Sequence, residues 1–300
     1  MFLPPEPARL TRESSPDHAM EHPKKQEAVA SEIKLSLDQF EVERPLGKGM
    51  FGSVSLAKHR KSGFICVLKV LQKKDMSLDR TEKHCRREIE IHSNLRHPNI
   101  LRFFNWFHDE TRIFIVLEFA VGGALHEVLF NEGTPGFTEA RAAKYVAQVA
   151  DALRYLHSKN IMHRDIKPEN ILLGPYDEVK LADFGYSAYS PSNRRVTRCG
   201  TLDFMPPEML ATDDKPYGRE VDYWTLGCLA FELLTGQAPF AHMKTEETER
   251  KIQALEIGEF PMHISSEARN FVLMVRYVDQ LLFTLPCGHR TPSRTSILTW

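Results

Sequence analysis

Three closely spaced glycines near the start of the chain could bring its backbone against a phosphate group. The run Gly47-Lys48-Gly49-Met50-Phe51-Gly52-Ser53-Val54 matches the pattern GxGxxGxV. Glycine suits such a loop because a β-carbon would block close approach of the backbone to an anion. The shorter pattern GxGxxG also opens dinucleotide-binding folds, but there a helix must follow the third glycine. Here Ser53–Leu56 alternates like a strand, which favours a flap over phosphates between two strands, with an ordinary hairpin as the alternative.

A lysine inside an apolar run is the second feature that could do chemistry. Lys69 lies 17 residues after Gly52, within the run Ile65–Val70. An unpaired charge in a buried strand is costly, so Lys69 needs an anionic partner. Glu88, on a predicted helix, is the candidate. Together the two residues would hold the α- and β-phosphates of a nucleotide; a purely structural ion pair is the alternative.

The elements that must position these residues can be predicted from hydrophobic periodicity. Five stretches with strand-like patterns surround one helical stretch at residues 81–95. The predicted strands are Phe40–Glu43, Ser53–Ala57, Phe64–Leu71, Ile100–Phe107 and Arg112–Phe119. Beyond a hinge near Glu118–Gly123 the pattern becomes helical, with an amphipathic helix at Thr138–His157 and an apolar one at residues 219–235. We therefore predict an α+β fold: a small lobe with a five-stranded antiparallel sheet, then a larger, mainly helical lobe.

The most specific motifs lie in the predicted helical lobe. His163-Arg164-Asp165-Ile166-Lys167-Pro168-Glu169-Asn170 matches HRDxKPEN, and Asp183-Phe184-Gly185 begins 18 residues after Asp165. Pro206-Pro207-Glu208 ends 25 residues after Asp183. These segments resemble the catalytic loop, the metal-binding turn and the end of the activation segment of eukaryotic protein kinases. The resemblance covers about Phe40 to Val272 and implies the two-lobed protein kinase fold.

The resemblance implies catalytic roles for several of these residues. Asp165 would orient a substrate hydroxyl and accept its proton, and Lys167 would meet the γ-phosphate. Asn170 and Asp183 would bind two Mg²⁺ ions, which prefer hard oxygen ligands. Lys69 and Glu88 would complete the catalytic set. His163 and Phe184 are expected to pack in the core beneath.

The same resemblance implies an ATP site. Leu46, Val54, Val67 and Leu172 would sandwich the adenine, the backbone of Glu118 and Ala120 would bind its edge, and Leu117 would be the gatekeeper. Val67 stands where the family usually has alanine, so its extra methyl groups narrow the site. The full set of predicted ATP-binding residues is Leu46, Gly47, Lys48, Gly49, Met50, Gly52, Val54, Val67, Lys69, Leu117, Glu118, Ala120, Glu169, Asn170, Leu172 and Asp183.

Lys167 within KPEN is typical of serine/threonine kinases, and further stretches resemble the Aurora family. They include Arg86–Ile91, Leu95–Arg102, His157–Lys159 and Arg194–Glu208, with a double proline before Glu208. This resemblance implies a role in mitotic chromosome segregation, with histone H3 as a substrate and an inner-centromere-type activator around the small lobe. It also implies a location in nucleus and cytoplasm, at the mitotic spindle and at the centromere or kinetochore.

Two regulatory and specificity features follow from the same resemblance. Thr197 matches the Aurora activation threonine, whose phosphate would bind Arg164 first, with Arg195 or Arg198 as further partners. Thr201 is expected to contact Asp165 and Lys167 instead, and Asp222 is expected to brace the catalytic loop. Glu169 and Glu232 match positions that bind substrate arginines, so protein substrates with Arg or Lys at −2 and −3 are expected. A structural role for both glutamates is the alternative.

The chain departs from the kinase pattern at its C-terminal end. We predict a disordered tail at 1–36 and a kinase domain at 37–272, with a small lobe at about 37–120 and a large lobe at about 121–272. Residues 273–300 form an atypical segment in which Phe283 replaces the arginine expected to pair with Glu208; Arg290 or Arg294 could substitute. A catalytically weak or unstable kinase-like scaffold is therefore the alternative function.

Composition excludes other classes. Lys and Arg total 39 and Asp and Glu total 40, a formal net charge of −1, so no broad basic surface for direct nucleic acid binding is expected. No apolar stretch is long enough to cross a membrane. The five cysteines form no CxxC pair and are interpreted as reduced thiols.

Overall fold

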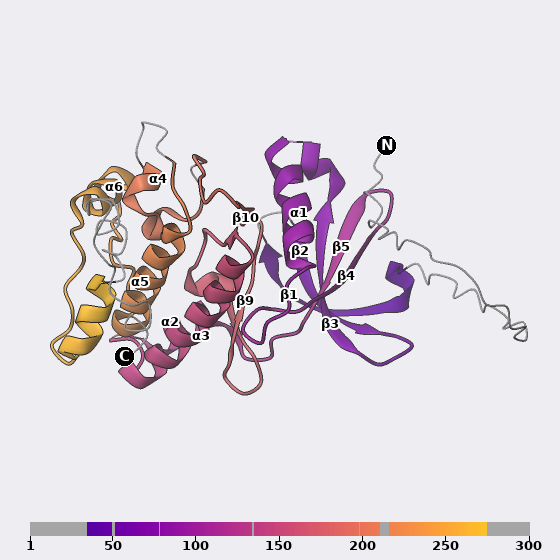
Figure 1. The fold of residues 1–300 in the computed structure, drawn as a ribbon. Helices are drawn as coiled ribbons and strands as arrows, with labels where there is room; N and C mark the ends of the chain where they lie inside the picture. The colour runs from indigo at the N-terminus through magenta and orange to yellow at the C-terminus, as the bar shows by residue number, and fades with distance from the viewer. Residues whose placement is uncertain are drawn as a thin grey trace, which may run out of the picture. The chain divides into compact units, whose positions relative to one another are not determined.

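The computed structural model describes residues 35–49, 52–77, 79–133, 135–197, 199–210 and 216–274. Its small lobe is a five-stranded antiparallel sheet with strand order β1-β2-β3-β5-β4. Figure 1 shows these strands with α1 beside them. The elements are β1 (Phe40–Gly49), β2 (Gly52–His59), β3 (Ile65–Gln72), α1 (Asp79–His92), β4 (Phe103–His108) and β5 (Arg112–Leu117). The predicted α+β fold is confirmed.

The central strand β3 has apolar residues on both faces because each face packs into a separate hydrophobic cluster. Cys66 and Leu68 pack with Phe40, Phe107 and Phe114 in one cluster. Val67 and Leu71 face the other way, into a cluster that includes Cys85 of α1. Alternate residues of a strand share a face, so Lys69 lies on the same side as Val67 and Leu71 and is directed toward α1.

The large lobe consists of helices and short strand pairs. Its helices are α2 (Leu125–Glu132), α3 (Glu139–Ser158), α4 (Pro207–Leu210), α5 (Glu220–Thr235) and α6 (Thr245–Ala254), and residues 266–274 are also helical. Its strands are β6 (Gly123–Ala124), β7 (Ile161–Met162), β8 (Ile171–Leu173), β9 (Val179–Leu181) and β10 (Ala188–Tyr189). Thr138 caps α3 by accepting a hydrogen bond from the Arg141 amide, which explains why the helix starts there.

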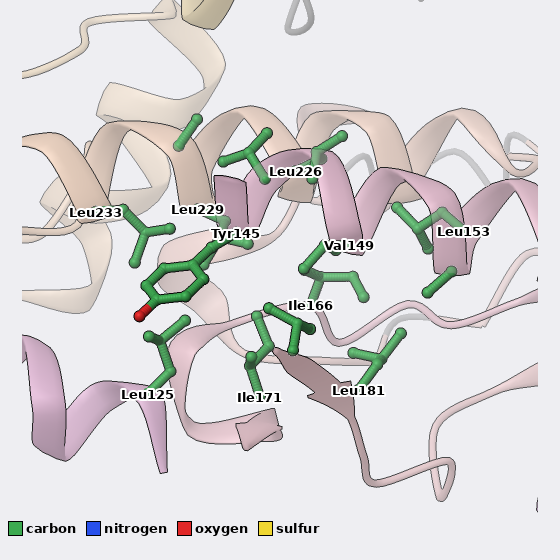
Figure 2. Close-up of a cluster of buried hydrophobic side chains, with 14 of the residues drawn as sticks. Leu125, Tyr145, Val149, Leu153, Ile166, Ile171, Leu181, Leu226, Leu229 and Leu233 are labelled. Atoms are coloured by element: carbon green, nitrogen blue, oxygen red, sulfur yellow. The ribbon is translucent and has the colours of Figure 1, made fainter. Parts of the chain in front are cut away.

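The core of the large lobe lies between α3 and α5 and extends under the catalytic loop. Figure 2 shows apolar side chains of the two helices together with residues from the loop and strands below them. Ile166, next to Asp165 in the chain, is fully buried in this cluster. The catalytic loop is therefore fixed by a buried apolar anchor as well as by hydrogen bonds.

A short backbone link joins residues near the start of β4 to β9. Leu101 N donates to Leu181 O at 2.9 Å, and Leu181 N donates to Asn99 O at 2.9 Å. Ile100 forms a parallel bridge with Leu181, which explains why β4 begins at Phe103, three residues later than predicted. The helix predicted for residues 81–95 ends at His92, because Ser93 and Asn94 form a turn.

Some predicted segments lie outside the described residues. These include residues 1–34 of the predicted tail and 275–300 of the C-terminal segment. Within the described ranges, no helix combines the length and hydropathy needed to cross a membrane.

Candidate active site

Lys69 and Glu88 form a buried ion pair between β3 and α1. Lys69 Nζ lies 2.6 Å from Glu88 Oε1 and 2.9 Å from Oε2. Burial alone would lower the pKa of Lys69, but the carboxylates of Glu88 and Asp183 outweigh it and raise that pKa. Lys69 therefore stays protonated at neutral pH, as a fixed positive charge facing Asp183.

The side chain of Asp165 is held by three neighbours. Its Oδ1 accepts hydrogen bonds from Thr201 N at 3.0 Å and Thr201 Oγ1 at 2.9 Å. Its Oδ2 accepts from Asn170 Nδ2 at 2.7 Å and lies 3.1 Å from Lys167 Nζ. Lys167 Nζ also donates to Thr201 Oγ1 at 2.6 Å. The expected contacts of Thr201 are thus present, and they join the activation segment to the catalytic loop.

Asp222, at the start of α5, supports the catalytic loop from below. It is fully buried and accepts from His163 N at 2.9 Å, Arg164 N at 2.7 Å and His157 Nε2 at 2.7 Å. Burial alone would raise its pKa, but these hydrogen bonds hold the pKa below its ordinary value. The carboxylate therefore stays ionised and braces the loop, as expected from the sequence. This matters because Arg164 has a φ of 70°, a strained conformation for a residue other than glycine.

Asp183 and Asn170 provide oxygen atoms suited to a hard cation. Asp183 is exposed and adopts a φ of 60°, with its Oδ1 accepting from Gly185 N at 3.2 Å. Desolvation alone would raise the pKa of Asp183, but the Lys69 charge and the Gly185 hydrogen bond lower it. Asn170 uses only its Nδ2 toward Asp165, which leaves its Oδ1 available.

These two residues fit Mg²⁺, which usually takes few protein ligands and completes its shell with phosphates and water. The described residues contain no group of three or more His, Cys, Asp or Glu side chains that could hold a metal ion.

Phe184 links the metal-binding turn to α1. Its buried ring lies 5.0 Å from the His163 ring and 4.5 Å from the His92 ring, centroid to centroid. The predicted burial of His163 and Phe184 is confirmed. His92 donates from Nε2 to Leu101 O at 2.6 Å, while its buried Nδ1 finds no hydrogen-bond partner among the described residues.

The predicted adenine-binding residues lie largely in one cluster. Val67 and Leu117 are buried there, with Val54 and Leu172 packed against them. Leu46 is 37% exposed and lies outside that cluster. The cluster provides an apolar surface of the kind that holds a flat ring.

The hinge offers the polar groups that an adenine edge would need. The Glu118 amide donates to Arg102 O, and the Ala120 carbonyl accepts from Gly123 N. Within the described ranges, the Glu118 carbonyl and the Ala120 amide make no hydrogen bond. An acceptor and a donor of the backbone are therefore available beside the apolar cluster.

The described residues of the glycine-rich run lie where β1 pairs with β2, so the run joins two strands as predicted, and its role as a phosphate flap stays a prediction. Gly47 has no atom within 4 Å of the place where a β-carbon would be. A β-carbon on Gly52 would lie 1.8 Å from Val70 O, so glycine is required there by the pairing of β2 with β3. Lys48 and Gly49 end β1, and Met50 lies outside the described residues.

Two arginines lie close to Thr197: Arg195 is two positions before it, and Arg164 reaches its backbone carbonyl through the Tyr217 hydroxyl. The Thr197 side chain is exposed. Burial, followed by the charges of Arg164 and Arg195, lowers the pKa of Arg87 on α1, so Arg87 lies within electrostatic reach of both. Sequence analysis named Arg164 and Arg195 but missed Arg87. The signal was its position directly before Glu88, which directs it to the adjacent face of α1. Arg198 lies outside the described residues.

Three carboxylates also gather beside the catalytic loop. Burial raises the pKa of Glu232 to about 8, with further contributions from Glu169 and Asp203. Glu232 Oε2 is buried and makes no hydrogen bond within the described ranges. The predicted pair Glu169 and Glu232 is thus brought together, and Asp203, which sequence analysis missed, joins it. Asp203 lies in a short 3-10 helix, Leu202–Phe204, whose placement depends on the fold of the activation segment.

Glu208 lies half-buried at the start of α4. Phe283, which stands in place of the arginine expected to pair with Glu208, lies outside the described residues. So do the two possible substitutes, Arg290 and Arg294.

Comparison with known proteins agrees with this geometry. The chain matches the protein kinase domain family over residues 40–280. It is 46% identical to Aurora kinase B of Danio rerio over 264 residues, which are 88% of this chain and 81% of that protein. It is 49% identical to Aurora kinase of Schizosaccharomyces pombe over 240 residues, covering 80% of this chain and 66% of that protein. With Aurora kinase A-A of Xenopus laevis the identity is 48% over 236 residues, covering 79% and 57%. The chain belongs to the Aurora family of protein serine/threonine kinases, whose reaction uses ATP and a divalent metal.

Proposed function

We propose that this chain transfers the γ-phosphoryl group of ATP, with Mg²⁺, to serine or threonine residues that follow basic residues. The observation that carries the proposal is the coupling of Lys69 to both Glu88 and Asp183. A fixed ammonium beside an ionised carboxylate, at the edge of an apolar cluster, suits a nucleotide triphosphate. When bound, Mg²⁺ would neutralise charge on the phosphates.

Each residue of the site has a separate task in this proposal. Lys69 binds the α- and β-phosphates while Glu88 fixes its position. Asn170 and Asp183 hold the metal through their oxygens. Lys167 meets the γ-phosphate. Asp165 orients the substrate hydroxyl and accepts its proton at the carboxylate, and the hydrogen bonds from Asn170 and Thr201 keep that carboxylate in place.

Substrate preference is proposed to come from the carboxylate cluster of Glu169, Glu232 and Asp203. A buried oxygen of Glu232 that no described residue hydrogen-bonds favours a ligand that brings donors with it. An arginine at −2 or −3 of a substrate does this, because its guanidinium binds carboxylates through several donors.

We further propose that Thr197 is the activating phosphorylation site. Its side chain is exposed to a modifying enzyme, Arg195 lies two positions before it, and Arg164 reaches its backbone carbonyl through Tyr217, with Arg87 in electrostatic reach of both arginines. The Arg195 Nε is buried and makes no hydrogen bond within the described ranges. A phosphate there would bring close to two negative charges and relieve the repulsion among the arginines.

The Aurora relationship supports the biological part of the proposal. By that relationship the kinase acts in mitotic chromosome segregation, at the spindle and at the centromere or kinetochore, in nucleus and cytoplasm. Histone H3 is the proposed substrate, and an inner-centromere-type protein is the proposed activator.

Phosphate transfer to a peptide tests the proposed activity. The peptide carries residues 190–200 of this chain, in which Arg194 and Arg195 stand at −3 and −2 from Thr197. We expect transfer by the natural chain and a loss of about 10²- to 10⁴-fold in Asp165→Asn, the range for removal of a general base. Peptides with alanine at −2 or −3 should be poorer substrates.

A binding measurement separates the kinase from the scaffold alternative. Mg²⁺-ATP should raise the melting temperature of both proteins, because Asp165→Asn keeps the nucleotide site. A chain that melts higher with Mg²⁺-ATP but transfers no more phosphate than Asp165→Asn would be a nucleotide-binding scaffold, and the proposed activity would be wrong.

A further inference from the structure

The phenol of Tyr217, just before α5, joins two parts of the kinase that are distant in sequence. Tyr217 is 5% exposed. Arg164 Nη1 donates to its hydroxyl at 2.8 Å, and the hydroxyl donates to the backbone carbonyl of Thr197 at 2.5 Å. One oxygen atom therefore connects the catalytic-loop arginine to the backbone of the activation-segment threonine.

Backbone contacts make this connection more than a single hydrogen bond. Tyr217 N donates to Arg195 O at 2.7 Å, and Arg195 N donates to Tyr217 O at 2.8 Å, an antiparallel bridge. The Cys199 thiol lies beside the phenol, and each group influences the pKa of the other. Tyr217 thus contacts the activation segment at three points: before Thr197, at Thr197 and after it.

The chemistry of the phenol suits a permanent contact. Burial, against an opposing effect of the Arg164 charge, raises the pKa of Tyr217 to about 12. The hydroxyl therefore keeps its proton throughout the neutral range and always has a donor for the Thr197 carbonyl. The bond uses a backbone oxygen, so it does not depend on which side chain stands at position 197.

The contact also determines the orientation of Arg164. Its Nε donates to Tyr186 O at 2.8 Å while Nη1 is held by Tyr217, so the plane of the guanidinium is fixed from two sides. Among the described residues, Nη2 of Arg164 makes no hydrogen bond. A planar guanidinium held along one edge presents its remaining donors in a defined direction.

We propose that Tyr217 is a positioning residue that holds the activation segment on the catalytic loop, and orients Arg164, before any phosphate is added. The proposal rests on the proposed function only in taking Thr197 as the phosphorylation site. Once Thr197 is phosphorylated, pairs between its phosphate and the arginines hold the same segment, and the contribution of the phenol becomes smaller.

The test compares Tyr217→Phe in two phosphorylation states. This change removes one oxygen atom and keeps the ring. In a Thr197→Ala background, where the backbone carbonyl remains, we expect Tyr217→Phe to lower kcat/KM for the basic peptide about two- to tenfold, the effect of one hydrogen bond. In the chain phosphorylated on Thr197, the loss should be less than about twofold. Tyr176→Phe, which removes an exposed tyrosine hydroxyl, is the matched control and should change neither value.

Trypsin cleavage after Arg194 and Arg195 gives a readout that does not depend on activity. In the Thr197→Ala background, Tyr217→Phe should speed cleavage there by about the same two- to tenfold, because the segment detaches more often. Unchanged cleavage, or an equal loss of kcat/KM in both phosphorylation states, would overturn the inference. Full activity of Thr197→Ala alone would instead contradict the proposed phosphorylation site. The cleavage rates of the Tyr217→Phe variant would then decide whether Tyr217 holds the activation segment.

Discussion

Lowering the pH from 7 to 5 should destabilise this protein through one buried histidine, His92. The residue is 1% exposed, donates to Leu101 O and packs against Phe184. Burial lowers its pKa from 6.5 to about 4; the Leu101 hydrogen bond opposes this change, and the charge of Lys69 adds to it. The imidazole is therefore neutral in the folded protein near pH 7.

The sign and size of the effect follow from proton linkage. Between pH 6.5 and about pH 4 the unfolded chain binds a proton at position 92 that the folded chain does not. The free energy of unfolding therefore decreases as the pH is lowered from 6.5 to about 4. A pH of 5 lies about 1.5 units below the pKa of 6.5 that this histidine has in the unfolded chain. Each unit corresponds to about 1.4 kcal/mol, so His92 lowers the free energy of unfolding by about 2 kcal/mol relative to pH 7.

Urea unfolding at pH 7 and pH 5, in the natural chain and in His92→Gln, isolates this contribution. Other titrating groups, including His163 and Asp183 near the ring, remain in both proteins, so their contributions largely cancel in the comparison. We expect the pH-dependent loss to be about 2 kcal/mol smaller in His92→Gln. In thermal unfolding this is a difference of roughly 4–8 °C for a domain of this size. An identical pH-dependent loss in the two proteins would refute the reasoning.

Three further perturbations address the site directly. Lys69→Met should lower kcat at least about 100-fold with the far-ultraviolet circular dichroism unchanged, because a fixed charge on the phosphates is lost; activity above a tenth of the natural level would contradict its role. The KM for a peptide with arginine at −2 should fall about tenfold from pH 7 to pH 9, as Glu232 ionises around its pKa of about 8, and should be flat in Glu232→Gln. A peptide with alanine at −2 is the control, and equal pH profiles for the two enzymes would exclude the contact. Asp222→Asn, which keeps the shape but cannot accept three hydrogen bonds as a carboxylate does, should cost about 3 kcal/mol and lower the melting temperature by roughly 6–12 °C in calorimetry; a change under 2 °C would contradict the bracing role.

Much of the fold could be predicted because its signals are local. The alternation of β3 placed Lys69 on a buried face, and helical periodicity placed Glu88 on α1, so their pairing followed from two short patterns. The catalytic loop and the metal-binding turn were predictable for another reason. Their residue order is specific to one fold, so a match in sequence implies the geometry.

The missed features depend on contacts between distant segments. Ile100 has the apolar character of a strand residue, but its partner is Leu181, some eighty positions later, so local pattern could not place the start of β4. Asp203 joins the carboxylate cluster only because the activation segment folds back on the catalytic loop. Tyr217 has no motif at all, and its role appears only when Arg164 and Thr197 lie on either side of its hydroxyl.

Two carboxylates position the two halves of the site: Asp222 holds the catalytic loop in the large lobe, and Glu88 holds Lys69 in the small lobe. Asp222 is bound to backbone amides of the catalytic loop, so that half is fixed as long as the large lobe is folded. Glu88 is bound to the side chain of Lys69, and its position depends on where α1 lies. The link between the halves runs through the ring of Phe184, packed against His92 of α1. A displacement of α1 would therefore break the Lys69 pair and leave Phe184 without its neighbour, while Asp165 stayed in place. The position of Lys69 and Glu88 therefore depends on the packing of α1, whereas the position of the catalytic-loop backbone depends on Asp222 and the large lobe.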